Sequence, residues 1–477
     1  MLPAQELKIS KDVLAAGLVI ILLSLVIGLN FFAGFNLYLY LLCGAVSFAA
    51  VIARPRAGLY ALVFLTFIWE KFFTLAPLVL NGQEYKFYLF DLLFCAMMVA
   101  WLIAFVSGRL ELKWRAADWL LLAFIIIVSV DFLVSAFGLK TPLQPTFSSW
   151  KNYGLYALLF WLTTWLIDSR EHLRRLFYFA IAGGIGILGF LAYGLYTGTG
   201  LWTEYTPLST PGTRILAFNH AFYLSLLFLP ALAYVIAKRN KLAGWLTILL
   251  PVWLIGIIGS LMRHLWIALI GGFFVMILAF GGQWRRNFYH LAQKYLWLVC
   301  GLALAVALMT TMAYYLPFSQ RVATESAQLF SRVNALTLGD DSSVLWRQAV
   351  WQTAWHNYGW TGLAGAGFGQ SVVINLNGYR SVVELRNMHN SWLAILLQTG
   401  VLGLVVLLLW LATLTWKVMK KKVAGDWSRL VKVSLFGLAT VQAIAWLFQP
   451  YLEANFLGSF FWLTWGLIQN YGQGLID

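Results

Sequence analysis

Apolar runs of roughly twenty residues recur along the chain from Val13 to Gln469. Each run is long enough to cross about 30 Å of hydrocarbon. We therefore predict an all-α polytopic membrane protein with about 12 to 14 transmembrane helices. The expected spans are residues 13–29, 37–53, 57–80, 88–106, 118–138, 150–167, 176–197, 216–237, 242–258, 265–281, 295–316, 390–416, 432–448 and 456–471.

One long polar segment interrupts this pattern at residues 317–388. It is far longer than a usual connection, and loops of this length are usually functional. We predict a single integral membrane domain over residues 1–477 that contains this large loop with its short helices. Asp340 to Ser343 offer N-cap oxygens for a helix that Gly359 is placed to end. The glycine-rich stretch that follows, residues 359–369, is interpreted as a flexible turn, with close backbone approach to a ligand as the alternative.

Composition and charge sharpen this picture. An apolar share of 61% with only 11% charged residues excludes a water-soluble fold. If the N-terminus is cytoplasmic, 22 of the 33 lysines and arginines lie in cytoplasmic loops, as the positive-inside rule requires. The net charge of +15 is then explained by topology and membrane lipids, and no nucleic-acid partner is expected. The same topology places the loop 317–388 in the periplasm.

Most of the basic residues that the positive-inside rule does not explain are arginines. Seven arginines follow residue 200 on the outer side of the predicted membrane. The planar fork of arginine binds pairs of phosphate oxygens, so this excess indicates an anionic ligand on that side. The seven are Arg214, Arg263, Arg321, Arg332, Arg347, Arg380 and Arg386.

His389 lies at the start of the apolar helix that follows the loop, with Asn390 or Ser391 as the candidate cap. The helix dipole and nearby arginines both disfavour the imidazolium. We therefore expect a neutral imidazole that accepts a proton near pH 7, the state that a general base needs. The alternative is a polar residue that anchors the helix start at the headgroup level.

Three stretches together resemble the O-antigen ligase and O-antigen polymerase family of bacterial membrane proteins. They are Gly259–Arg263, Ser342–Arg347, and His389–Leu393 followed by Gln398–Gly403. The resemblance implies an all-helical, GT-C-like glycosyltransferase of the bacterial inner membrane. Such an enzyme moves a glycan from an undecaprenyl-diphosphate carrier to a glycan, lipid or protein acceptor at the periplasmic face, as in lipopolysaccharide synthesis.

The resemblance also implies roles for individual residues. Arg263, Arg214 and Arg347 would hold the donor diphosphate, and His389 would activate the acceptor hydroxyl. The alternatives without a ligand are that Arg263 only extends its charge to the membrane interface, and that Arg214 and Arg347 are solvated loop residues. For His264, beside Arg263, we expect a structural hydrogen bond.

We expect no cofactor and no metal, because a diphosphate is already a good leaving group whose charge arginines can stabilise. Asp340 and Asp341 could hold a divalent ion, but adjacent carboxylates at a helix start are more often caps. A transporter or flippase of lipid-linked glycans is the competing function. It is disfavoured because the chain shows no repeated halves and carries its large loop in one half only. Ligase and polymerase are not distinguished.

Overall fold

The computed structural model describes most of the chain, but not all of it. The predicted span at 295–316, apart from its first two residues, and Asp340 and Asp341 lie outside the described residues. The structure describes residues 10–34, 36–69, 78–80, 83–85, 88–111, 113–197, 214–238, 240–279, 282, 284–293, 295–296, 342–376, 379–423, 425–454 and 456–477.

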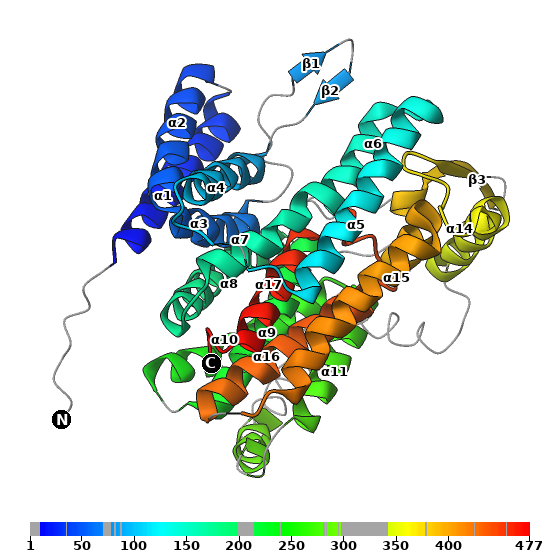
Figure 1. The fold of residues 1–477 in the computed structure, drawn as a ribbon. Helices are drawn as coiled ribbons and strands as arrows, with labels where there is room; N and C mark the ends of the chain where they lie inside the picture. The colour runs from blue at the N-terminus through cyan, green and yellow to red at the C-terminus, as the bar shows by residue number, and fades with distance from the viewer. Residues whose placement is uncertain are drawn as a thin grey trace.

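Helices account for most of the described chain (Figure 1). Eight of the described helices are long and apolar enough to cross a membrane, and three shorter apolar helices accompany them. The predicted all-α polytopic membrane fold is confirmed. The helices are α1 (Lys11–Ala33), α2 (Leu37–Ala53), α3 (Pro55–Ile68), α4 (Leu89–Val106), α5 (Ala116–Leu133), α6 (Leu143–Trp150), α7 (Leu159–Leu166), α8 (Arg170–Thr197), α9 (Phe218–Ala237), α10 (Lys241–Gly259), α11 (Arg263–Leu278), α14 (Ser342–Tyr358), α15 (Ser391–Lys420), α16 (Asp426–Ala445) and α17 (Ser459–Gln473).

Most predicted spans coincide with a helix to within a few residues, but the span at 57–80 is wrong in extent. Helix α3 ends at Ile68, and residues 78–80 form a strand instead. The physical reason is visible in the sequence, where Glu70 and Lys71 interrupt the apolar run. Charged side chains at the centre of a span are costly, so the apolar stretch is better divided there.

Two short antiparallel hairpins depart from the expected helices. Strands β1 (Leu78–Leu80) and β2 (Gln83–Tyr85) form one, and β3 (Ser371–Leu376) and β4 (Tyr379–Glu384) form the other. The large loop contains the expected helix α14, and the hairpin is an addition to the prediction. The sequence signal was available, because β-branched residues flank the dipeptide Asn377-Gly378, a strong hairpin signature.

Helix α9 lies at the centre of the bundle. Of the apolar stretch of α9 that could cross the membrane, 78% is buried inside the protein, the highest share among the eight candidate spans. It packs against α8, α10, α11 and α16, while α15 runs along α5 on another side (Figure 1). Residues that begin α9 are therefore held by several neighbours at once.

The described part of the large loop forms a small layer at one end of the bundle, here called the loop end. Helix α14 packs on strand β3 beside the start of α15 (Figure 1). The predicted helix in this loop is confirmed, and it ends at Tyr358 before Gly359. The layer has its own apolar core, built from Val350, Ala354, Ala366, Val372, Ile374, Val383, Leu385, Met388, Ala394 and Leu397.

The glycine-rich segment, residues 359–369, inserts its backbone into a break in α15. Gly400 interrupts the helix with a φ of 68°. Around this break the N–H groups of Ala366 and Gly367 donate to the carbonyls of Leu397 and Gln398, at 2.7 and 3.0 Å. In return, Val401 and Leu402 donate to Gly362 and Leu363, at 3.2 and 3.3 Å. The segment consists largely of turns, and its close backbone approach is to α15, where it replaces helix hydrogen bonds.

Candidate functional site

Arg214 and Arg263 are brought together by a backbone contact between the start of α9 and the end of α10. The N–H of Ile215 donates to the carbonyl of Gly259 at 3.2 Å. A Cβ on Gly259 would lie 2.3 Å from the end of the Ile215 side chain, so a larger residue would force that side chain to move. Arg263 follows a turn of three residues as the first residue of α11, and within that turn Leu261 has a φ of 56°. Positive φ in a branched residue is uncommon and marks a strained turn.

The buried side chain of His264 lies at the centre of the predicted site. Its Nε2 atom is 2.6 Å from the hydroxyl of Tyr451, which confirms the expected structural hydrogen bond. Both side chains are almost fully buried, at 6% and 1% exposure. His264 lies within electrostatic range of Arg214, Arg263, Arg347 and His389. The structure therefore gathers all four predicted site residues around one imidazole.

Helix α14 brings Arg347 to this cluster and places an aromatic ring over the proposed base. The rings of Trp346 and His389 meet edge to face, with centroids 4.9 Å apart. One turn further along, the indole of Trp351 donates to the carbonyl of Met388 at 2.7 Å. Both contacts fix the end of the large loop immediately before α15, so the position of His389 depends on α14.

His389 itself has a left-handed backbone, with a φ of 60°. A non-glycine residue in this region costs free energy and persists only when its neighbours hold it. Here Met388 is held by Trp351, and the N–H of Ser391 donates to the carbonyl of Trp446 at 2.9 Å. Of the two candidate caps, Asn390 is the one used, because its side chain accepts from the N–H of Leu393 at 3.0 Å.

The imidazole of His389 is neutral, for a reason that differs from the expected one. Burial lowers its pKa to about 3, and the charge of Arg347 adds to this effect. Desolvation is therefore the main cause of the neutral ring, ahead of the arginine charge. A bound diphosphate would offset the charge of Arg347, the smaller of the two causes, and so raise this pKa.

Glu453 is a buried carboxyl near the site that the sequence did not single out. It is 5% exposed and accepts a hydrogen bond from Ser391 Oγ at 2.5 Å. Tyr153 donates to its other carboxyl oxygen. Burial raises the pKa of Glu453 to about 7, against the opposing effect of these two hydrogen bonds. The only available signal was a glutamate within an otherwise apolar C-terminal stretch.

This raised pKa predicts a pH-dependent stability. Between the ordinary pKa of 4.5 and the folded value of about 7, the folded state binds the proton more tightly, so stability falls as pH rises. At about 1.4 kcal/mol per unit, the loss reaches about 3 kcal/mol. Tyr153 and Arg386 are the other ionisable groups that act on Glu453. Thermal unfolding in detergent from pH 4 to 8 should show the wild type losing stability relative to Glu453→Gln up to pH 7. Parallel curves would contradict the assignment.

The other outer arginines are arranged differently. Arg386 forms an ion pair with Glu384 at 2.5 Å, and Arg380 is exposed on β4. Arg321 and Arg332 lie outside the described residues. Arg214, Arg263 and Arg347 are thus the members of the predicted set that lie within electrostatic range of His264.

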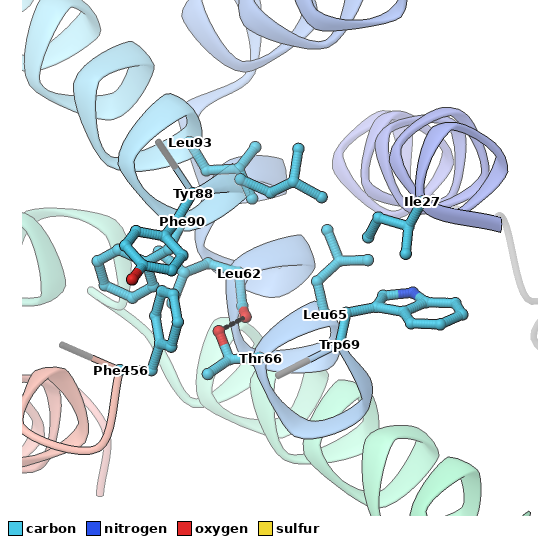
Figure 2. Close-up of a pocket in the computed structure, with 10 residues that line it drawn as sticks. Ile27, Leu62, Leu65, Thr66, Trp69, Tyr88, Phe90, Leu93 and Phe456 are labelled. Atoms are coloured by element: carbon cyan, nitrogen blue, oxygen red, sulfur yellow. Dashed lines mark hydrogen bonds between the residues drawn. The ribbon is translucent and has the colours of Figure 1, made fainter. Parts of the chain in front are cut away.

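A separate apolar pocket lies between α1, α3 and α4 (Figure 2). No charged side chain lines it, so it offers nothing to a diphosphate. The arginine cluster around the buried His264 is the better candidate for chemistry. The pocket is lined by Ile27, Leu62, Leu65, Thr66, Trp69, Tyr88, Leu89, Phe90, Leu93 and Phe456.

Residues 246–408 match the family described as O-antigen ligase. No curated protein matches the chain. The matched range includes Arg263, Arg347 and His389, together with the glycine-rich segment and the break in α15. Arg214 and the residues that follow α15 lie outside it.

Proposed function

Because the chain carries an O-antigen ligase domain at residues 246–408, we propose that it is a glycosyltransferase acting on a lipid-linked glycan. The donor is a glycan on undecaprenyl diphosphate, and the acceptor is a glycan, a lipid or a protein. The reaction takes place at the periplasmic face of the bacterial inner membrane. The observation that supports this most is the convergence of Arg214, Arg263, Arg347 and His389 around His264.

Each of these side chains has a chemical task in the proposed reaction. The arginines bind the diphosphate oxygens and stabilise the charge that develops as the bond from the sugar to phosphate breaks. His389 takes the proton from the acceptor hydroxyl as the new glycosidic bond forms. The products are the elongated acceptor and the carrier diphosphate, with the proton on His389. Because arginines supply the positive charge, the proposal includes no metal and no cofactor.

Transfer by purified protein in liposomes tests the proposal. The assay contains labelled undecaprenyl-diphosphate glycan and candidate acceptors, with and without EDTA. We expect labelled product that EDTA does not reduce. Addition of a whole chain to a different acceptor identifies a ligase, whereas a ladder of repeat units identifies a polymerase. Movement of the donor between leaflets without any transfer would identify a flippase and overturn the proposal.

Arg263 provides a sharp variant for this assay. Removing one donor from a site that stabilises developing charge costs about 100- to 1000-fold in rate. We expect Arg263→Ala to lower kcat/KM by about that factor and Arg263→Lys to restore only part of it, because lysine lacks the planar fork.

Arg380→Ala is the matched control for Arg263→Ala. It removes the same charge from an exposed position on β4, so its rate should equal that of the wild type. Equal losses in the two variants would indicate that net surface charge matters, and would remove Arg263 from the donor site.

A further inference from the structure

The connection between α16 and α17, residues 446–458, is here called the connector. It follows the matched O-antigen ligase domain in the chain, and it presents two polar side chains close together at the loop end. Tyr451 and Glu453 are two residues apart and have different partners. Each partner adjoins a proposed functional residue, since His264 follows Arg263 and Ser391 lies two residues after His389.

Tyr451 links the connector to the arginine cluster. Besides its 2.6 Å contact with His264, its ring stacks on that of Phe222 in α9, with centroids 4.4 Å apart. Arg214 and Arg347 both lie within electrostatic range of its hydroxyl. This one side chain therefore contacts α9 and α11 and adjoins the cluster to which α14 contributes Arg347.

Glu453 links the connector to the start of α15. Ser391 Oγ donates to its carboxylate at 2.5 Å and accepts from the N–H of Leu452 at 3.3 Å. The backbone N–H of Ser391 donates to Trp446, which is also in the connector. Ser391 is thus held by three hydrogen bonds, two residues after the strained backbone of His389.

The connector is in turn anchored in the N-terminal half of the chain. Tyr153 donates to the Glu453 carboxylate, and Asn152 donates to its backbone carbonyl. Figure 2 shows Phe456 facing Tyr88 and Phe90, and the rings of Phe456 and Tyr88 meet edge to face at 4.8 Å. These contacts give the connector a fixed base on helices that carry none of the proposed functional residues.

We propose that Tyr451 and Glu453 are positioning residues that set the separation between the diphosphate-binding arginines and the base. Tyr451 holds His264 beside Arg263, and Glu453 holds Ser391 beside His389. Neither touches the reacting atoms in this role. The inference rests on the proposed transferase function, so its test includes a measurement that does not depend on transfer.

Kinetics provide the first measurement. A small misplacement of a reacting group costs about 100-fold in rate while leaving the binding groups in place. We expect Glu453→Ala to lower kcat by about 10- to 100-fold and to change the donor KM by less than about threefold. Glu453→Gln keeps the hydrogen bond from Ser391 and should recover most of kcat. Glu111→Ala, an exposed carboxylate before α5, is the control and should be unchanged.

The second measurement is the reactivity of His389 toward diethyl pyrocarbonate, followed by mass spectrometry. His356 is exposed on α14 and serves as an internal reference in the same protein. We expect the ratio of His389 to His356 modification to rise severalfold in Glu453→Ala and to stay at the wild-type value in Glu453→Gln. Ser391→Ala removes only a hydroxyl and should raise the ratio too, so it replaces Glu453→Ala if that variant does not fold.

The two measurements separate the possible failures. An unchanged ratio in Glu453→Ala and Ser391→Ala would overturn the positioning role, whatever the enzyme does. A fall in kcat/KM that comes from a higher donor KM, with kcat unchanged, would also overturn the positioning role, because donor binding would then be the affected step. If the ratio rises but the wild type shows no transfer, the positioning of His389 stands and the proposed function is what fails.

Discussion

Replacing His389 by alanine is expected to lower kcat for glycan transfer by about three orders of magnitude, because general-base catalysis contributes about 100- to 10,000-fold. The arginines remain in this variant, so binding of the labelled donor should change little. The measurement is the single-turnover rate with saturating donor and acceptor in liposomes, alongside donor extraction by the same vesicles.

His356→Ala is the control for this experiment, since it removes an exposed histidine from α14 at the same end of the molecule. Its rate should match that of the wild type. A His389→Ala enzyme that keeps more than about a tenth of the wild-type kcat would sink the general-base role, because that loss lies below the range for such catalysis. His389 would then be a structural residue beneath Trp346.

Gly400→Ala is expected to prevent stable folding of the loop end. Gly400 has a φ of 68°, and a Cβ there would lie 2.1 Å from the carbonyl oxygen of Leu363. The substitution thus adds left-handed strain and separates the glycine-rich segment from α15, breaking buried backbone hydrogen bonds. Together these effects should cost more than about 3 kcal/mol. Size-exclusion profiles and thermal unfolding in detergent measure the loss.

Gly244→Ala is the matched control for Gly400→Ala. Gly244 lies in α10 with an ordinary helical backbone, and nothing lies within 4 Å of a Cβ built there. Alanine favours a helix over glycine by about 1 kcal/mol, so this variant should be as stable as the wild type or more so. Comparable stability of the two variants would show that the backbone insertion at Gly400 is not required.

The helices were predictable because the length of an apolar run is set by the membrane, a constraint local in sequence. Span 37–53 coincides with α2, and span 88–106 differs from α4 by one residue. The packing of the glycine-rich segment was not predicted, because its partner, the backbone around Gly400, lies some 30 residues further along the chain. No local pattern of residues 359–369 reveals that another helix is broken to receive them.

The same distinction applies to the candidate site. Arg214, Arg263 and Arg347 belong to the basic residues that the positive-inside rule leaves unexplained, and the resemblance to the O-antigen ligase and polymerase family selected these three among them. No sequence pattern distinguishes Glu453, because its hydrogen-bond partner Tyr153 is 300 positions away in the chain. Even for His389, the sequence indicated a neutral ring, but the degree of burial that sets its pKa appears only in the folded structure.

The connector has a consequence for how the protein is made. Ribosomes deliver the chain from its N-terminus, so Arg263, Arg347 and His389 enter the membrane before residues 446–458 are translated. Until then, Ser391 and His264 lack the side chains that hold them. The strained backbone of His389 is supported only by the bond from Trp351 to Met388, because Trp446 has not yet been made. A nascent or truncated chain ending at α16 would carry every residue of the matched domain in an unassembled state. Translation of the connector would therefore supply the contacts that hold Ser391 and His264 only after every residue of the matched domain has been made.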